Sequence, residues 1–90
     1  MEKKKIDELL KELPTWALKD GHLCKRFEFG NFVEAMKFLN KVAKIAENEG
    51  HHPDFSVHYR KVDFEIWTHA VNGLSENDFI LAAKIDKLLK

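Results

Sequence analysis

The sequence has little of the residues that cross-link chains or span membranes. It contains one cysteine, Cys24, and only two prolines and four glycines among 90 residues. A single cysteine cannot form an internal disulfide bond, so a reducing compartment is expected. No apolar run approaches the about 18 residues of a transmembrane helix, and charged residues interrupt the N-terminal segment before it could form a signal peptide. The sequence therefore predicts a cytoplasmic protein without a membrane partner.

The chain also lacks an excess of charge of either sign. It has 15 basic and 15 acidic side chains, which gives a formal net charge of zero. Proteins that bind nucleic acids usually carry a basic excess, so no nucleic-acid partner is expected. The 44 % of hydrophobic residues indicates a packed core. Residues 1–90 suffice for one domain, and a domain this small would gain stability from a partner subunit.

The first third of the chain predicts a helix followed by a β-hairpin. Residues 4–13 carry apolar side chains at helical spacing, and Pro14 ends that helix. Asp20 and Gly21 are typical of the tight turn between two strands, because that turn needs positive φ angles. After the turn, apolar and polar side chains alternate over residues 23–29, as expected for a strand.

A second helix is predicted over residues 32–49. Asn31 is a favourable N-cap with Glu34 three positions on, and Gly50 suits the position that ends a helix. The apolar stripe expected to face the core consists of Phe32, Ala35, Met36, Leu39, Val42, Ala43 and Ala46.

Residues 55–68 predict a second hairpin with Arg60 and Lys61 as its turn. Tyr59 then faces Val62, and the apolar residues of the two strands match on one side. A last helix begins after Ser75, the N-cap of a capping box. The element order αββαββα predicts an α+β fold, with a four-stranded antiparallel sheet covered on one face by three helices.

Three histidines are expected to converge at the open end of the second hairpin. The predicted register places His52 opposite His69, and His51 adds a third imidazole beside them. Because like charges repel, protonating all of the neighbouring imidazoles costs free energy, and their apparent pKa values are expected to differ. Such a cluster can hold one proton donor and one acceptor near neutral pH, as general acid–base catalysis requires.

Other interpretations of these residues stay open at this point. The histidines could be surface or structural residues, and a metal site is a further alternative, although no HExxH pattern occurs. Cys24 lies in a predicted strand, and nucleophilic catalysis by this thiol has little support. Asp78 occupies the third position of the last helix, where a carboxylate closes the capping box.

The pattern of these residues resembles a known family. The run Glu47-Asn48-Glu49-Gly50-His51-His52-Pro53, followed by Thr68-His69, Gly73-Leu74 and Asp78, is similar to the signature of the pterin-4a-carbinolamine dehydratases. The resemblance extends over nearly the whole chain. It implies the fold predicted above and the loss of water from a 4a-hydroxytetrahydropterin, which recycles the cofactor of aromatic amino-acid hydroxylases.

The resemblance also implies roles for single residues. His51 and His69 would be the acid and the base, and His52 would bind and orient the pterin. Glu47, Thr68 and Asp78 would lie at the substrate pocket, where Asp78 would either orient one of the imidazoles or serve only the helix cap. No metal or organic cofactor is implied, and homodimers or homotetramers are expected. Some family members bind a transcription factor or serve another pterin, such as that of the molybdenum cofactor, so a non-catalytic binding or assembly module is the alternative.

Overall fold

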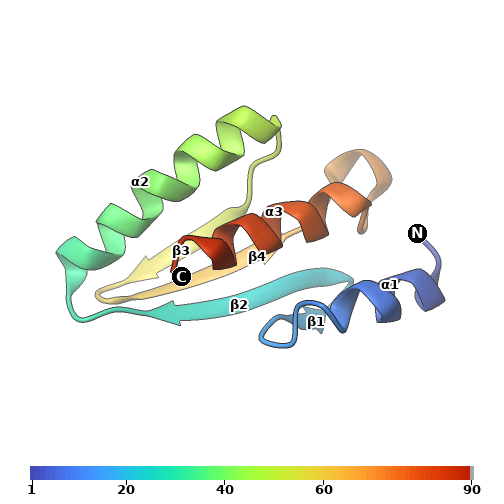
Figure 1. The fold of residues 1–90 in the computed structure, drawn as a ribbon, viewed down its shortest axis with the longest axis horizontal. Coiled ribbons are helices and arrows are strands. Elements are labelled where there is room, and N and C mark those ends of the chain that lie inside the picture. The colour runs from blue at the N-terminus through green and yellow to red at the C-terminus, as the bar shows by residue number, and fades with distance from the viewer. Residues whose placement is uncertain (90) are drawn as a thin grey trace.

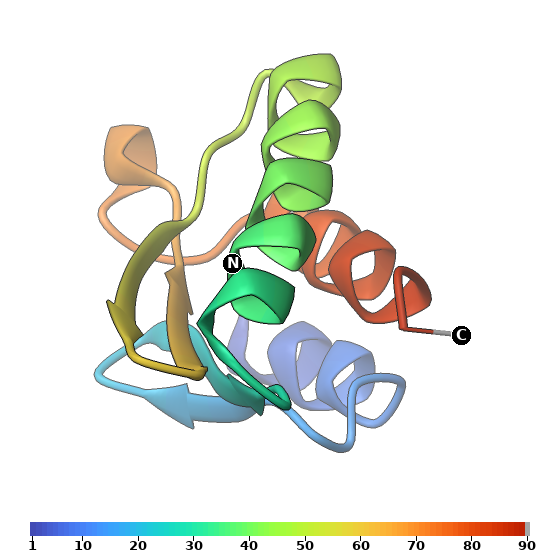
Figure 2. The same ribbon diagram turned by 90° about the vertical axis from the view of Figure 1, so that its left-hand side faces the viewer.

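The four strands of the protein form one antiparallel sheet, which three helices cover on one side (Figures 1 and 2). The computed structural model describes residues 1–89, and the strand order is β1-β2-β4-β3. The elements are α1 (Lys3–Leu10), β1 (Ala17–Lys19), β2 (His22–Glu28), α2 (Phe32–Glu49), β3 (Asp54–His58), β4 (Lys61–Ile66), the 3-10 helix η1 (His69–Val71) and α3 (Glu76–Lys87). The predicted α+β fold and its element order are confirmed. Within residues 1–89, no helix combines the length and apolar character needed to cross a membrane.

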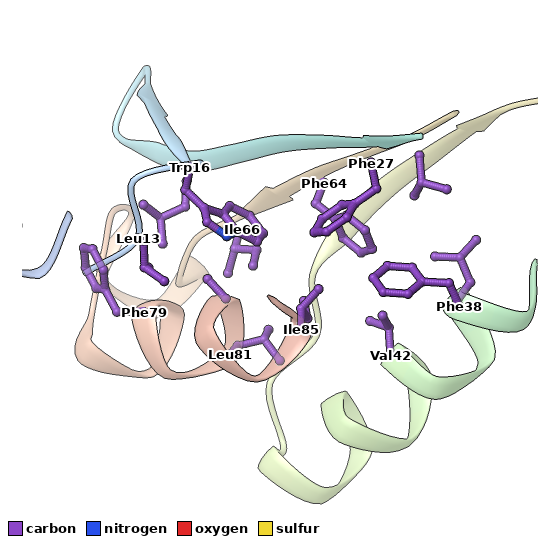
Figure 3. Close-up of a cluster of buried hydrophobic side chains, with 14 of the residues drawn as sticks. Leu13, Trp16, Phe27, Phe38, Val42, Phe64, Ile66, Phe79, Leu81 and Ile85 are labelled. Carbon is purple, nitrogen blue, oxygen red and sulfur yellow. The ribbon is translucent and has the colours of Figure 1, made fainter. Parts of the chain in front are cut away.

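The hydrophobic core lies between the sheet and the helices (Figure 3). Phe27 and Phe64 from the sheet meet Phe38 of α2, with ring centroids 5.0 to 6.2 Å apart. Ile85 of α3 and Val62 of β4 are fully buried in the same cluster. This core fixes α2 and α3 on one face, while the opposite face of the sheet stays open.

The first hairpin has the predicted turn. Asp20 and Gly21 have φ angles of 52° and 76°, and Lys19 pairs with His22 across them. Positive φ at both central residues is the geometry that matches the twist of the two strands.

The first helix is shorter than the sequence predicts. It ends at Leu10, and the amides of Glu12 and Leu13 donate to the carbonyls of Leu9 and Leu10 in tighter turns. The ring of Pro14 disfavours the helical conformation for the residue before it, so the helix unwinds ahead of the proline.

The stripe predicted for α2 is partly wrong. Phe32 and Met36 are exposed, at 48 % and 38 %, and Ala43 is exposed as well. Phe38, which lay outside the predicted stripe, is buried. The face that contacts the sheet is therefore rotated toward Phe38, since this side chain packs against Phe27 and Phe64 of the sheet.

The predicted register of the second hairpin is wrong by two residues. The turn consists of Tyr59 and Arg60, so Val57 pairs with Val62 and Phe55 pairs with Phe64. A shift of two keeps every side chain on its predicted face.

A contact outside the hairpin explains this register. The Phe29 amide donates to the Arg60 carbonyl at 2.9 Å, and Arg60 Nη1 donates to the Phe29 carbonyl at 3.2 Å. These bonds hold Arg60 in the turn at the end of β2. Tyr59 adopts a φ of 56°, which costs about 1–2 kcal/mol for a residue with a side chain.

The corrected register also changes the position opposite His52. Continued along β4, it places Trp67 there in place of His69. Strand β3 begins only at Asp54, so His52 is not part of the ladder. The predicted pairing of His52 with His69 is therefore wrong, and the two residues reach the same end of the sheet by another route.

Candidate active site

The end of α2 fixes the backbone of His51. Gly50 adopts the left-handed conformation with a φ of 62°, and the His51 amide donates to the Ala46 carbonyl at 3.1 Å. This bond is typical of a helix that ends on glycine. It turns the chain so that His51 leaves the last turn of α2 toward the first turn of α3.

Asp78 receives the side chain of His51 in the interior. Its carboxylate is fully buried, and Oδ1 lies 2.5 Å from His51 Nε2. Oδ2 accepts from the Thr68 hydroxyl at 2.9 Å and from the Ser75 amide at 2.8 Å. Because a carboxylate only accepts, Nε2–H of His51 donates, and Nδ1 is the ring nitrogen left to exchange a proton. Asp78 thus closes the capping box of α3 and orients an imidazole at the same time.

Thr68 joins this network to the loop that carries His69. The Thr68 amide donates to the Gly73 carbonyl at 2.8 Å, and the Gly73 amide returns a bond to the Thr68 carbonyl at 3.3 Å. The hydroxyl of Thr68 also lies 2.8 Å from that of Ser75. These bonds close residues 68–73 into a compact loop, so His69 directly follows a residue that shares Asp78 with His51.

His52 and Glu47 form a separate, exposed pair. Nε2–H of His52 donates to Glu47 Oε2 across the last turn of α2, and both side chains are largely in solvent. The pair orients the second imidazole without burying it.

His69 is the first residue of η1 and is exposed. Its ring lies against the indole of Trp67, with centroids 3.8 Å apart and planes 33° from parallel. Its backbone directly follows Thr68, and its ring contacts Trp67.

The structure places the six predicted site residues in three groups at one end of the sheet. His51, Thr68 and Asp78 share one network, Glu47 and His52 form a pair, and His69 packs on Trp67. Two participants were missed in the sequence. The sequence pattern assigns Ser75 only to the helix cap and does not place Trp67 in the site. Trp67 could have been found from its spacing, because residues two apart on a strand share a face.

The chemistry available at this end of the sheet is proton transfer. An imidazole held by a buried carboxylate has one tautomer and one free nitrogen, which suits a general acid or base. Within residues 1–89, no group of three or more His, Cys, Asp or Glu side chains is placed to hold a metal ion. The fold is a small α+β domain, and three of its histidines lie at one end of the sheet.

Comparison with known proteins identifies the family. The family model described as pterin 4 alpha carbinolamine dehydratase matches residues 1–88, and the chain belongs to this family. A Rickettsia canadensis protein assigned to the same family is 54 % identical over 96 % of this chain and 81 % of its own. A Rickettsia bellii relative is 50 % identical over 98 % of this chain and 80 % of its own.

Solved structures show the same fold. A protein from Brucella melitensis, described as a transcriptional coactivator/pterin dehydratase, has a TM-score of 0.94 and 29 % identity, and the match covers 100 % of this chain and 98 % of that one. A pterin dehydratase-like protein identified as a RuBisCO assembly factor in the alpha-carboxysome has a TM-score of 0.67 and 27 % identity, over 81 % of this chain and 84 % of that one.

Proposed function

We propose that this protein is a 4a-hydroxytetrahydropterin dehydratase, a carbon–oxygen lyase. It removes water from the 4a-hydroxy adduct and releases the quinonoid dihydropterin, which recycles the cofactor of aromatic amino-acid hydroxylases. One observation carries the proposal: in a member of this family, the His51 imidazole is oriented by the buried carboxylate of Asp78.

The chemistry of the step fits histidine side chains. Hydroxide is a poor leaving group, so an acid protonates the 4a-oxygen as the carbon–oxygen bond breaks. The neighbouring ring nitrogen supplies the electron pair that forms the new double bond. A base then takes the proton from a ring N–H, so one water leaves and no electrons are gained or lost. The step needs no metal or organic cofactor, because the ring itself provides the electrons.

The proposed roles follow the contacts. His51 and His69 act as the acid and the base, since His51 has one fixed nitrogen and His69 has a fixed ring. His52 binds and orients the pterin together with Glu47. Thr68 and Asp78 lie at the pocket, where Asp78 sets the tautomer of His51.

Stopped-flow absorbance of the decay of 4a-hydroxytetrahydropterin tests the proposal. The wild type is expected to accelerate water loss, and His51→Ala, His52→Ala and His69→Ala are each expected to lower the rate by about 10²–10⁴-fold without abolishing it. His58→Ala is the matched control, because His58 ends β3 at the far end of the hairpin. A folded wild type that gives no acceleration over the spontaneous reaction would refute the dehydratase function.

A second candidate function is a binding or assembly module. The two solved relatives described as a coactivator and as an assembly factor favour it. This function predicts partner binding that survives the histidine substitutions, with little turnover, whereas the dehydratase predicts turnover that depends on His51, His52 and His69. If the protein acts on another pterin, such as that of the molybdenum cofactor, it should turn over that pterin faster than 4a-hydroxytetrahydropterin.

We also propose that the protein acts as a homodimer or homotetramer in the cytoplasm. The edge strand β3 and the turn after it carry exposed aromatic residues, with Phe55 at 52 % and Tyr59 at 66 % exposure. Light scattering coupled to size-exclusion chromatography gives the mass in solution, and a monomer at micromolar concentration would contradict this proposal. The zero net charge favours neither nucleic acid nor an anionic membrane as partner.

A further inference from the structure

Trp67 lies between the first hairpin and the histidine end of the sheet. It directly follows β4, and its indole Nε1–H donates to Asp54 Oδ2 at 3.1 Å. Asp54 pairs with Glu65, so Trp67 lies on the open face of the sheet with these two carboxylates. The indole is half-buried, although no helix covers this face.

Both faces of this indole are covered by imidazoles. The His22 ring is stacked on it at 4.3 Å between centroids and 14° between planes, and the His69 ring lies at 3.8 Å and 33°. Two imidazoles at these distances and tilts cannot share one face of an indole without overlapping. His22 therefore covers one face of Trp67, and His69 covers the other.

The order of the strands shows which face His69 covers. His22 belongs to β2, and β4 lies between β2 and β3. His69 accordingly lies on the side of Trp67 that is turned away from β2 and toward β3. The segment that carries His51 and His52 leads into β3 at this same end of the sheet.

Trp67 is itself held from two directions. Asp54 fixes its edge, and His22 supports its far face. His22 is fixed in turn, because its Nδ1–H donates to Glu65 Oε2 at 2.7 Å. An indole restrained in this way can restrain the ring stacked on its remaining face.

We propose that Trp67 is a positioning residue that holds the imidazole of His69 in one orientation, and this inference rests on the proposed dehydratase function. His69 is exposed on a 3-10 helix of three residues, so its ring would sample several rotamers without a neighbour. Stacking against a fixed aromatic surface selects one of them. Since neither face of the indole is open, Trp67 acts through His69 and does not stack on the pterin.

Nuclear magnetic resonance tests the positioning without any substrate. Ring protons of His69 that lie over the indole are shifted upfield by its ring current. The wild type is expected to show this shift, Trp67→Phe to keep part of it, and Trp67→Leu to lose it. His69 ring protons at their free-imidazole positions in the folded wild type would overturn the proposal, whether or not the protein is a dehydratase.

Steady-state kinetics then test the consequence for catalysis. Trp67→Leu is expected to lower kcat by about tenfold and to leave KM within about twofold, because it misplaces a proton-transfer group and removes no substrate contact. Trp67→Phe should recover more than half of the lost activity. Phe32→Leu, an exposed aromatic-to-leucine change at the start of α2, is the control and should match the wild type. Unchanged kcat in folded Trp67→Leu would overturn the proposal.

A second variant keeps the test decisive if Trp67→Leu does not fold. His22→Leu removes the outer support and leaves the indole in place, so it should reduce the upfield shift of His69 and lower kcat by a few-fold. A folded His22→Leu protein with both quantities unchanged would count against the positioning role. An inactive wild type with the His69 shift present would refute the dehydratase function and leave the stacked geometry standing.

Discussion

His51 Nε2 and Asp78 Oδ1 lie 2.5 Å apart, and this contact joins the end of α2 to the first turn of α3. The carboxylate accepts three hydrogen bonds, from the His51 imidazole, the Thr68 hydroxyl and the Ser75 amide, and it lies in the first turn of α3. A single buried side chain therefore supports both the fold and the proposed catalytic group.

Replacing Asp78 with asparagine is expected to reduce stability and activity together. The amide keeps the size of the side chain and removes one acceptor, so a buried donor loses its partner at a cost of about 1–3 kcal/mol. The tautomer of His51 is no longer imposed, and the rate of water loss should fall by at least about tenfold. Urea unfolding and stopped-flow kinetics measure the two effects. Glu76→Gln, an exposed change in the same helical turn, is the control. An Asp78→Asn protein as active as the wild type would contradict the orienting role.

Thr68→Val should show how much the hydroxyl of Thr68 contributes to stability, apart from the volume of the side chain. Valine fills nearly the same space and cannot donate to Asp78, so the free energy of unfolding should fall by about 1–2 kcal/mol. Thr68→Ser retains the hydroxyl and should stay closer to the wild type. The comparison is made by thermal or urea unfolding, and equal losses in the two variants would show that the hydroxyl is unimportant.

Gly50→Ala should destabilise the protein through the backbone alone. The φ of 62° is left-handed, and a Cβ added at Gly50 would meet no atom within 4 Å. The expected cost is about 1 kcal/mol, since only the strained conformation contributes. Gly30→Ala is the matched control, because Gly30 also has open space around it and no left-handed φ. If both alanines had the same effect on urea unfolding, the left-handed turn before His51 would not be the cause.

The pair formed by Arg26 and Asp63 predicts a pH dependence of stability. Arg26 donates to both Asp63 oxygens, at 2.6 and 2.9 Å, and these bonds lower the pKa of the Asp63 carboxyl. A carboxyl with a lowered folded-state pKa contributes stability at neutral pH, and this contribution is lost as the pH falls through that pKa. The Tm difference between wild type and Asp63→Asn should be small and positive at pH 7, and should shrink below about pH 4. Asp7→Asn, on the exposed side of α1, is the control. A Tm difference that grows on acidification would contradict the sign.

The elements that could be predicted from the sequence are those specified by neighbouring residues. The turn at Asp20 and Gly21, the N-cap at Asn31 and the capping box that begins at Ser75 all depend on residues at most three apart, and all three are present. The turn at Tyr59 and Arg60 could not be predicted, since it depends on bonds to Phe29.

The same distinction holds for the candidate site. The predicted register grouped the three histidines, although the pairing of His52 with His69 was wrong, and the resemblance added a role for each. The partner of His51 was ambiguous, because the cap of α3 and the support of an imidazole require the same residue type at position 78. The stacking of His22 on Trp67 depends on the register between β2 and β4, which single-strand patterns do not contain. The catalytic and binding roles of these residues stay predictions until the kinetics are measured.

The bonds between Phe29 and Arg60 set the register of the whole second hairpin. Registers that differ by two residues bury the same faces, so the hydrophobic pattern alone does not choose between them. The choice is made at the tip, and it decides at the opposite end of β4 whether residue 67 or residue 69 reaches the chain that carries His51 and His52. Substitutions at Arg60 should therefore change the spacing of the histidines at the open end of the hairpin, although Arg60 does not contact them.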